Sequence, residues 1–509
     1  MHRPALNSLG VILSASILAN SAVAQPEHQH ETVLEDSWQV VFVQGQRVGY
    51  AHSVTWETGA GAGAGAGDDK HIWSESLTQM SIARFGGKLT MTVTQVTEED
   101  DAGNLLSFTL DTNNPPISHS IVTGTVRGDQ LHLTTTAAGK TTQSTQPWDA
   151  DVKSPVYQDR LLHEDPVVAG ETRTLRVFDP QFLKAGNVTL TGLEPQETEL
   201  LDGARRRLER TQIVHSLVPG LKMTAFQDEQ GETLKTETNL LSMVTYTVSR
   251  EEAVKEIAGP QLDLALSTIV VVEPISRAHQ RKRIVYELSV ERPHIMDALP
   301  EGDTQSVTAV DDQTVRVTVT SAKVAADEPS AQKEQSVDGA YRGPSRYLEC
   351  QHPQVAAHAK AAAGTLQAPA QIALAMEKYV HEKLVEKNFS TALATAAEVA
   401  SNLEGDCTEH AMLLAALLRV KDIPSRVAVG MVYSERHSAF VGHMWTEAFL
   451  DGRWIPLDAT LAQGGIGAAH LKFSDSSLSD DGPAPVTVFV PLVGLVNKLQ
   501  IKVIDAGAD

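Results

Sequence analysis

Short stretches of alternating apolar and polar residues dominate the first half of the chain. They are separated by Gly, Asn and Asp residues, and clear examples lie at 38–43, 88–96, 105–110, 121–126, 130–135, 188–193, 206–214 and 222–227. Alternation with a period of two is typical of half-buried β-strands, and Gly, Asn and Asp between such runs mark turns. The pattern therefore predicts a β-rich N-terminal domain over residues 25–255.

A second and shorter β pattern follows, with strands expected at 268–272, 283–290 and 315–319. We expect these strands to form a second small β domain over residues 256–330. Residues 331–345 are polar and contain Ser, Gly and Pro, which is the composition of a linker. The chain is therefore predicted to be multidomain.

The hydrophobic period changes to that of a helix in the last third of the chain. Between 368 and 386, apolar residues recur three and four positions apart, and residues 392–403 predict a further helix. A third helix is expected to begin at Cys407, and three strands are expected at 427–433, 443–450 and 453–458. Helices followed by consecutive strands predict an α+β domain over residues 346–509, with an N-terminal helical lobe and an antiparallel sheet.

Cys407 occupies the first position of the third predicted helix. Asp406 is a favourable N-cap residue and Glu409 follows three positions later, which is the spacing of a capping box. The unpaired backbone N–H groups and the helix dipole at this end favour a thiolate and can stabilise a developing oxyanion. The two carboxylates oppose thiolate formation, so a thiolate at Cys407 needs a cationic partner.

An Asp-Gly pair separates the last two predicted strands and is a strong signal for a two-residue hairpin turn. If Leu450 faces Arg453 across this turn, His443 faces Thr460 and lies diagonal to Asp458 on one face of the sheet. Diagonal neighbours are about 7–8 Å apart, which lets a carboxylate orient an imidazole. A register shift of one residue would place the two side chains on opposite faces. The turn therefore predicts that Asp458 orients His443.

A thiol at a helix start, an imidazole on a strand and a carboxylate on the next strand are the components of a catalytic triad. The candidate residues are Cys407, His443 and Asp458. Each of them alone has an ordinary structural explanation, since single cysteines and histidines usually pack or form hydrogen bonds. Their order and positions together favour nucleophilic catalysis, with His443 as the cationic partner of Cys407.

At these residues the sequence resembles the transglutaminase-like superfamily, which shares its core with papain-like cysteine proteases. The short bacterial members, many of them exported, are the most similar, and the resemblance covers residues 346–475. It implies a papain-like fold with Cys407 as nucleophile, His443 as general base and acid, and Asp458 as the orienting residue. The motifs that carry it are Gly405-Asp406-Cys407-Thr408-Glu409-His410, Ile423-Pro424-Ser425-Arg426-Val427, His443-Met444-Trp445-Thr446-Glu447 and Trp454-Ile455-Pro456-Leu457-Asp458-Ala459-Thr460.

Two other uses of these side chains stay open. Cys350 and Cys407 are the only cysteines in the chain, and a disulfide between them would remove the nucleophile. A zinc site formed by Cys407, His410, His443 and Asp458 is a further alternative, although this is not a usual structural ligand set and the chain has no Cys-x-x-Cys motif. We expect neither a metal nor another cofactor.

The resemblance also implies an upstream side chain that completes the oxyanion hole. Ser401 and Asn402 are the candidates, and no motif distinguishes them. The calcium sites of animal transglutaminases lie outside the matched motifs, so the resemblance implies no calcium dependence.

Residues 1–24 have the features of a signal peptide. They combine a positive start at Met1-His2-Arg3, an apolar stretch and a small-residue cleavage site at Ala22-Val23-Ala24. We therefore expect export to the periplasm or the extracellular space. The net charge of −22 disfavours nucleic acids and anionic membranes as partners. No later apolar run reaches the ~20 residues that a membrane helix needs, so we expect no membrane span.

These observations lead to one main functional prediction and one alternative. The main prediction is an exported cysteine-dependent acyl-transfer enzyme, either an amide or peptide hydrolase or a transglutaminase, that acts on a protein or peptide substrate. The alternative is a non-enzymatic cell-envelope binding or scaffold protein, in which the β-rich region is functional and the transglutaminase-like domain is a relic. Neither the oligomeric state nor the second substrate follows from the sequence.

Overall fold

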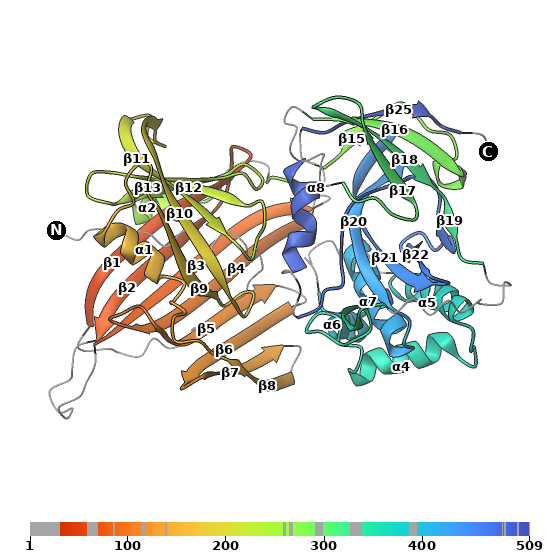
Figure 1. Ribbon diagram of the computed structural model, residues 1–509, viewed down its shortest axis with the longest axis horizontal. Helices are drawn as coiled ribbons and strands as arrows, with labels where there is room; N and C mark the ends of the chain where they lie inside the picture. The colour runs from red at the N-terminus through yellow and green to blue at the C-terminus, as the bar shows by residue number, and fades with distance from the viewer. Residues whose placement is uncertain are drawn as a thin grey trace. The chain divides into compact units, whose positions relative to one another are not determined.

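The computed structural model describes residues 31–58, 70–84, 87–114, 118–137, 140–257, 261–263, 268–290, 299–325, 337–385, 394–480, 482, 485–495 and 498–507. The chain divides into two compact units, here called the N-terminal unit (residues 1–83 and 88–262) and the C-terminal unit (residues 84–87 and 263–509). Figure 1 colours the first from red to yellow-green and the second from green to blue. The expected signal peptide at 1–24 and residues 331–336 of the expected linker lie outside the described residues.

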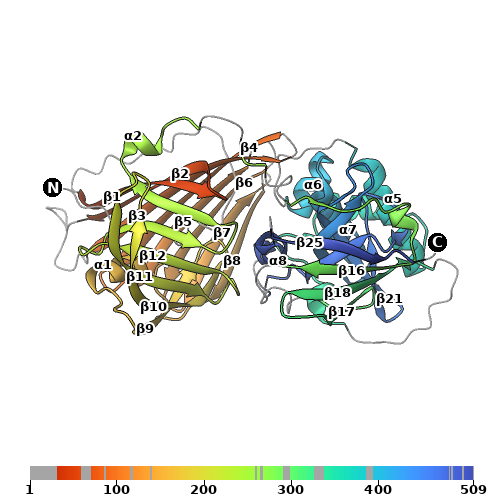
Figure 2. The same cartoon turned by 90° about the horizontal axis from the view of Figure 1, so that it is seen from above.

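One antiparallel sheet dominates the described part of the N-terminal unit. Its order is β8-β7-β6-β5-β4-β3-β2-β1-β14-β13-β12-β11-β10-β9, so β1 and β14 join two runs of sequential strands. Figure 2 shows how strongly this sheet curves. The prediction of a β-rich N-terminal region is confirmed. The bounds are β1 Glu31–Val43, β2 Gln46–Thr58, β3 His71–Arg84, β4 Gly87–Asp100, β5 Leu105–Asn114, β6 Ser118–Arg127, β7 Gln130–Ala137, β8 Lys140–Pro147, α1 Tyr157–Glu164, β9 Thr172–Asp179, β10 Lys184–Glu199, β11 Arg205–His215, β12 Lys222–Gln227, β13 Thr233–Thr238, β14 Met243–Val248 and α2 Arg250–Ala253.

The buried face of this sheet is unusually polar. In β3, Ile72, Ser74, Ser76 and Thr78 are buried, whereas the residues between them are partly exposed. Buried hydroxyl groups need hydrogen-bond partners, and here they find them across strands, as in the 2.9 Å bond between Thr55 Oγ1 and Ser74 Oγ. Small side chains that satisfy one another let neighbouring strands bury a polar face.

Antiparallel sheets also form the strand layer of the C-terminal unit. The largest has the order β15-β21-β20-β24, with β22 paired to β21. A second has the order β17-β18-β16-β25, and β19 pairs with β23. Their bounds are β15 Val270–Val271, β16 Arg283–Ser289, β17 Gln305–Ala309, β18 Thr314–Thr320, β19 Ala322–Lys323, β20 Ser425–Ser434, β21 Ala439–Leu450, β22 Arg453–Leu457, β23 Gly465–Ile466, β24 His470–Ser476 and β25 Gln500–Asp505.

The strands expected to form a separate small domain at 256–330 share the hydrophobic core of the C-terminal unit. Buried residues of β16 and β18 belong to the same apolar cluster as the helices that follow them. Tyr286 donates a 2.7 Å hydrogen bond to the carbonyl of Ala468, and Gln305 donates one of 2.8 Å to the carbonyl of Lys472. The last strand, β25, completes their sheet by pairing with β16. Local periodicity marks strands, but it does not show which distant strands pair.

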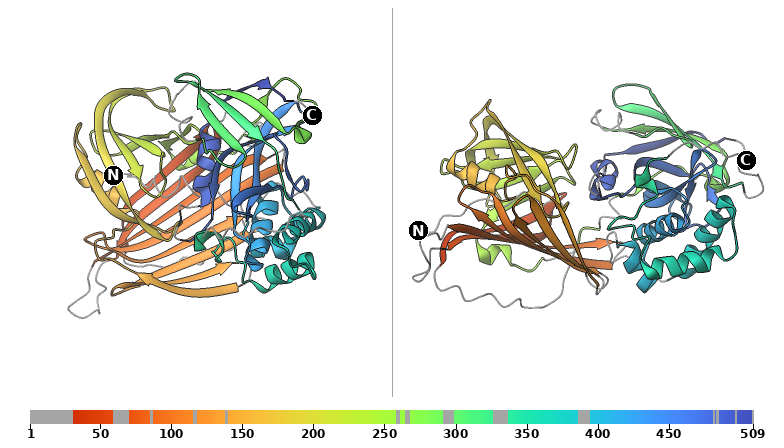
Figure 3. Two further views of the ribbon diagram at one scale, coloured as in Figure 1. Left: turned by 45° about the vertical axis from the view of Figure 1, so that its right-hand side comes forward. Right: turned by 60° about the horizontal axis from the view of Figure 1, so that its bottom comes forward.

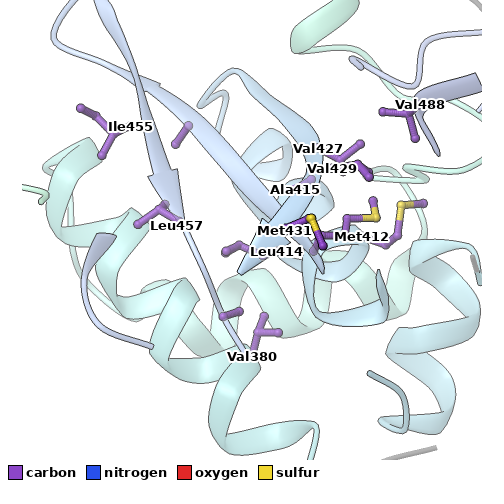
Figure 4. Close-up of a cluster of buried hydrophobic side chains, with 14 of the residues drawn as sticks. Val380, Met412, Leu414, Ala415, Val427, Val429, Met431, Ile455, Leu457 and Val488 are labelled. Carbon is purple, nitrogen blue, oxygen red and sulfur yellow. The ribbon is translucent and has the colours of Figure 1, made fainter. Parts of the chain in front are cut away.

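The helices α4 to α7 pack together into one lobe beside β20 and β21 (Figure 3). The helix α7 packs against β20, β21 and the other three helices, so it forms the centre of this lobe. Figure 4 shows part of the resulting core. Val380 of α5 and Leu414 of α7 lie together there with Val429 of β20 and Leu457 of β22. The bounds are η1 Ala278–Gln280, η3 Gly339–Tyr341, α4 Pro353–Ala363, α5 Pro369–Lys383, α6 Ala396–Asn402, α7 Cys407–Val420, η4 Pro485–Phe489 and α8 Val490–Gly494.

The described residues of this unit therefore combine helices with antiparallel sheets. Among the helices described, none combines the length and the apolar character that crossing a bilayer would require.

Candidate active site

The start of α7 fixes the position of Cys407. The side chain of Asp406 accepts a 2.9 Å hydrogen bond from the backbone N–H of Thr408, and Glu409 Oε2 accepts one of 3.0 Å from the N–H of Asp406. The capping box predicted from the sequence is confirmed. Cys407 consequently occupies the first helical position, where backbone N–H groups point out of the helix end.

The loop before this helix is held by two features. Gly405 has a φ of +143°, and a Cβ atom there would lie 2.4 Å from the Cβ of Glu409. Glu409 is fully buried, and its Oε1 accepts hydrogen bonds from the N–H of Ala394 at 3.3 Å and from Thr408 Oγ1 at 2.8 Å. The chain around the thiol is thus anchored on both sides of the cap.

The hairpin has the register that its Asp-Gly turn predicts. Leu450 pairs with Arg453, and Asp451 and Gly452 between them have φ values of 51° and 79°. Positive φ at both central positions is the requirement of a type I′ turn. Asp458 follows directly after the end of β22, one residue beyond the paired region.

His443 and Asp458 come together on one face of this hairpin. His443 Nε2 lies 2.8 Å from Asp458 Oδ2, and both side chains are almost completely buried. The remaining ring nitrogen, Nδ1, is the one available to the thiol, and Cys407 is close enough to His443 to raise the pKa of its imidazole. The structure therefore places His443 and Asp458 in direct contact, with Cys407 near the imidazole.

A contact between helix and sheet keeps this geometry. Thr446, three residues after His443 on β21, donates a 2.8 Å hydrogen bond from Oγ1 to the carbonyl of Ala411 on α7. This contact packs α7 against β21, the strand that carries His443. It joins chain segments that lie far apart in the sequence, so no local pattern predicts it.

Charges within the site favour the imidazolium form of His443. Burial lowers the pKa of His443, but the charge of Asp458, the hydrogen bond to Asp458 and the interaction with Cys407 outweigh it and raise that pKa to about 10. Burial raises the pKa of Asp458, yet His443 and His470 hold the pKa of this carboxyl well below its usual range. The site therefore contains a buried carboxylate that stabilises positive charge on the neighbouring imidazole.

Sequence reasoning missed His470, the first residue of β24. Its Nε2 lies 3.0 Å from Asp458 Oδ2, the same oxygen that contacts His443. The other oxygen, Oδ1, accepts hydrogen bonds from the backbone N–H groups of Thr460 at 2.9 Å and Leu461 at 3.4 Å. No local pattern marks His470, because it reaches the site only through the pairing of β24 with β20.

Two side chains of α5 form hydrogen bonds with the loop that follows Asp458. Glu377 accepts a 2.9 Å hydrogen bond from the N–H of Gly464, and His381 Nδ1 lies 3.0 Å from the carbonyl of Ala459. Burial raises the pKa of Glu377 to about 7. In the sequence both residues belong to an ordinary amphipathic helix, so no signal distinguishes them.

The sequence left open a disulfide between Cys350 and Cys407 and a zinc site that includes His410. Cys350 and Cys407 are both free thiols, so the disulfide considered from the sequence is not formed. His410 Nδ1 lies 2.6 Å from the carbonyl of Asp406, within its own helix. Among the described residues, the nitrogen and oxygen atoms of His443, Asp458 and His470 lie within 4.8 Å of one another, and both imidazoles use Nε2 in a hydrogen bond with Asp458 Oδ2.

The expected oxyanion side chains lie at the end of α6. The hydroxyl of Ser401 donates a 2.8 Å hydrogen bond to the carbonyl of Ala397 and also contacts Gln354, so it is committed to its own helix and to α4. Asn402 is the exposed last residue of α6. The cap at Asp406 engages the N–H groups of Thr408 and Glu409, so the N–H of Cys407 is the oxyanion donor that the start of α7 offers.

Comparisons with known proteins agree with the location of this site. Residues 356–459 match the family model of the transglutaminase-like superfamily. The comparison with curated proteins gave no match.

Solved structures resemble larger parts of the chain. A "Putative Cysteine Protease" from Cytophaga hutchinsonii has 15% identity and a TM-score of 0.29, covering 47% of this chain and 88% of its own. A "putative protease" from Parabacteroides distasonis has 12% identity and a TM-score of 0.19, covering 69% and 68%. A beta-barrel-like protein of a domain of unknown function from Brucella abortus has 8% identity and a TM-score of 0.28, covering 42% and 96%.

Proposed function

We propose that this chain, whose residues 356–459 form a transglutaminase-like domain, is an exported cysteine-dependent acyl-transfer enzyme. Cys407 is the nucleophile, His443 the general base and acid, and Asp458 the residue that orients His443. The observation that carries the proposal is the hydrogen-bonded pair of His443 and Asp458, which lies close to Cys407 at the N-terminus of a helix.

The arrangement accounts for both halves of an acyl transfer. His443 takes the thiol proton through Nδ1, and the thiolate attacks a carboxamide or peptide carbonyl carbon. The backbone N–H of Cys407 and the positive end of the α7 dipole stabilise the oxyanion that forms. As the C–N bond breaks, the imidazolium returns its proton to the leaving amine, which leaves an acyl group on Cys407.

The acceptor decides the type of enzyme. If water attacks the thioester, His443 deprotonates the water and the enzyme is an amidase or peptidase. If a primary amine attacks, His443 deprotonates the amine and the enzyme is a transglutaminase. We favour hydrolysis, because water is always available as an acceptor, and a protein or peptide of the cell envelope as substrate.

Casein and a fluorescent primary amine test the proposal with both acceptors present. The purified wild-type protein is expected either to generate new amino termini or to incorporate the amine, and Cys407→Ser to do neither. Cys350→Ser is the matched control, because it removes the other thiol and should keep full activity. Equal product formation by wild type and Cys407→Ser would contradict the proposal and favour the non-enzymatic scaffold.

A further inference from the structure

The carboxylate of Asp458 is shared by two imidazoles, and only one of them faces the thiol. Its Oδ2 lies 2.8 Å from His443 Nε2 and 3.0 Å from His470 Nε2. A carboxylate oxygen accepts hydrogen bonds and donates none, so each imidazole nitrogen must carry a proton toward it. His470 therefore competes with His443 for the same negative charge.

His470 is held in one protonation state. Burial lowers the pKa of His470 to about 4, so the ring is neutral at physiological pH. A neutral ring that donates through Nε2 has an unprotonated Nδ1, and His470 Nδ1 is buried with no hydrogen-bond partner among the described residues. An unsatisfied buried nitrogen destabilises the folded protein. Packing alone does not account for a histidine at this position, since an apolar side chain would leave no nitrogen unsatisfied.

We propose that His470 is a positioning residue that sets how strongly Asp458 holds the proton on His443. This inference rests on the proposed function of Cys407 and His443. By donating to Oδ2, His470 fixes the carboxylate and withdraws part of its charge from His443. The imidazolium then remains acidic enough to return its proton to the leaving amine.

Two other titratable residues near His470, His279 and Lys472, have partners of their own. The ring of His279 on η1 lies edge-on at 5.8 Å, and its Nε2 is 2.8 Å from the carbonyl of Tyr433. Lys472, two residues along β24, is paired with Glu447 at 2.8 Å and Asp475 at 2.7 Å.

Two further charged groups act on this site from neighbouring helices. Glu377 on α5 interacts electrostatically with Asp458, and Cys407 on α7 interacts with His443. Among the described interactions, neither Glu377 nor Cys407 contacts His470. The shared hydrogen-bond acceptor, Asp458 Oδ2, is therefore the direct link between His470 and His443.

The experiment follows the thiolate of Cys407 by its ultraviolet absorbance as a function of pH, with Cys407→Ser as the baseline. Loss of the donor in His470→Leu concentrates the charge of Asp458 on His443, so the thiolate–imidazolium pair should form at a lower pH. Because a hydrogen bond to a charged group is among the stronger ones, the midpoint should fall by about one pH unit. Iodoacetamide alkylation on the acid side of the wild-type midpoint should become about tenfold faster.

His470→Gln is the rescue variant, because its amide N–H can still donate to Asp458. It should keep the wild-type midpoint, whereas a purely structural role would leave the midpoint of any folded variant unchanged. An unchanged midpoint in folded His470→Leu would overturn the inference. If His470→Leu does not fold, a clear midpoint shift in folded His470→Gln would overturn it instead. A wild-type thiol that titrates like free cysteine would overturn the proposed function itself.

Discussion

Replacing Asp458 by asparagine tests how much of the site depends on one buried charge. The side chain keeps its size and an acceptor oxygen, but it loses the negative charge that stabilises imidazolium at His443. The difference between the pKa of about 10 for His443 and the ordinary 6.5 corresponds to about 5 kcal/mol. Without the charge, burial dominates and lowers the pKa of His443, so the thiol loses its proton acceptor near neutral pH.

The expected effect is a large loss of thiol reactivity. If half of this free energy is lost, alkylation of Cys407 by iodoacetamide at pH 7 should slow by about 100-fold. The rate is followed by mass spectrometry of the peptide that contains Cys407. Asp422→Asn is a matched control, since Asp422 is exposed and pairs only with Arg342 at the surface among its described contacts. A folded Asp458→Asn protein alkylated within threefold of the wild-type rate would refute the reasoning.

Three further substitutions test the supports of the site and the buried face of the large sheet. Gly405→Ala places a Cβ atom 2.4 Å from Glu409, so urea unfolding should show a loss of about 1–3 kcal/mol, and wild-type stability would contradict the capping geometry. Arg419→Met removes the donors for the carbonyls of three residues at the base of α7, and it should lower stability by about 3 kcal/mol in the same assay. Burial raises the pKa of Glu99 to about 7 from 4.5, so the folded N-terminal unit binds the proton more tightly than the unfolded chain and loses stability as pH rises through this window. Glu99→Gln should remove most of that loss, and thermal unfolding that declines equally between pH 5 and pH 8 in both proteins would contradict it.

Local sequence rules predicted the parts of the site that depend on short spacings. The cap at Asp406 and Glu409 and the Asp-Gly turn act within a few residues, so they determine where α7 begins and which residues of β21 and β22 pair. Together with the resemblance to the transglutaminase-like superfamily, these two rules lead from the sequence to Cys407, His443 and Asp458 as candidates.

Features that depend on distant pairing could not be predicted. His470 and β25 reach their positions through strand pairs separated by long stretches of chain, which no local period records. For the same reason the strands at 283–320 were assigned to a domain of their own, although they share the core of the helices. The polar buried face of the N-terminal sheet was missed because alternation gives the period of a strand but not which of its faces is covered.

The most direct test of the account is the rate at which iodoacetamide alkylates Cys407 slightly below neutral pH, in the wild type and in His443→Ala. A free thiol is almost entirely protonated there, whereas a thiolate–imidazolium pair is not. The account predicts that wild-type Cys407 reacts about 100-fold faster than free cysteine and that His443→Ala abolishes this advantage. Equal rates for wild-type Cys407, the His443→Ala variant and free cysteine would contradict the claim that these side chains form a catalytic pair.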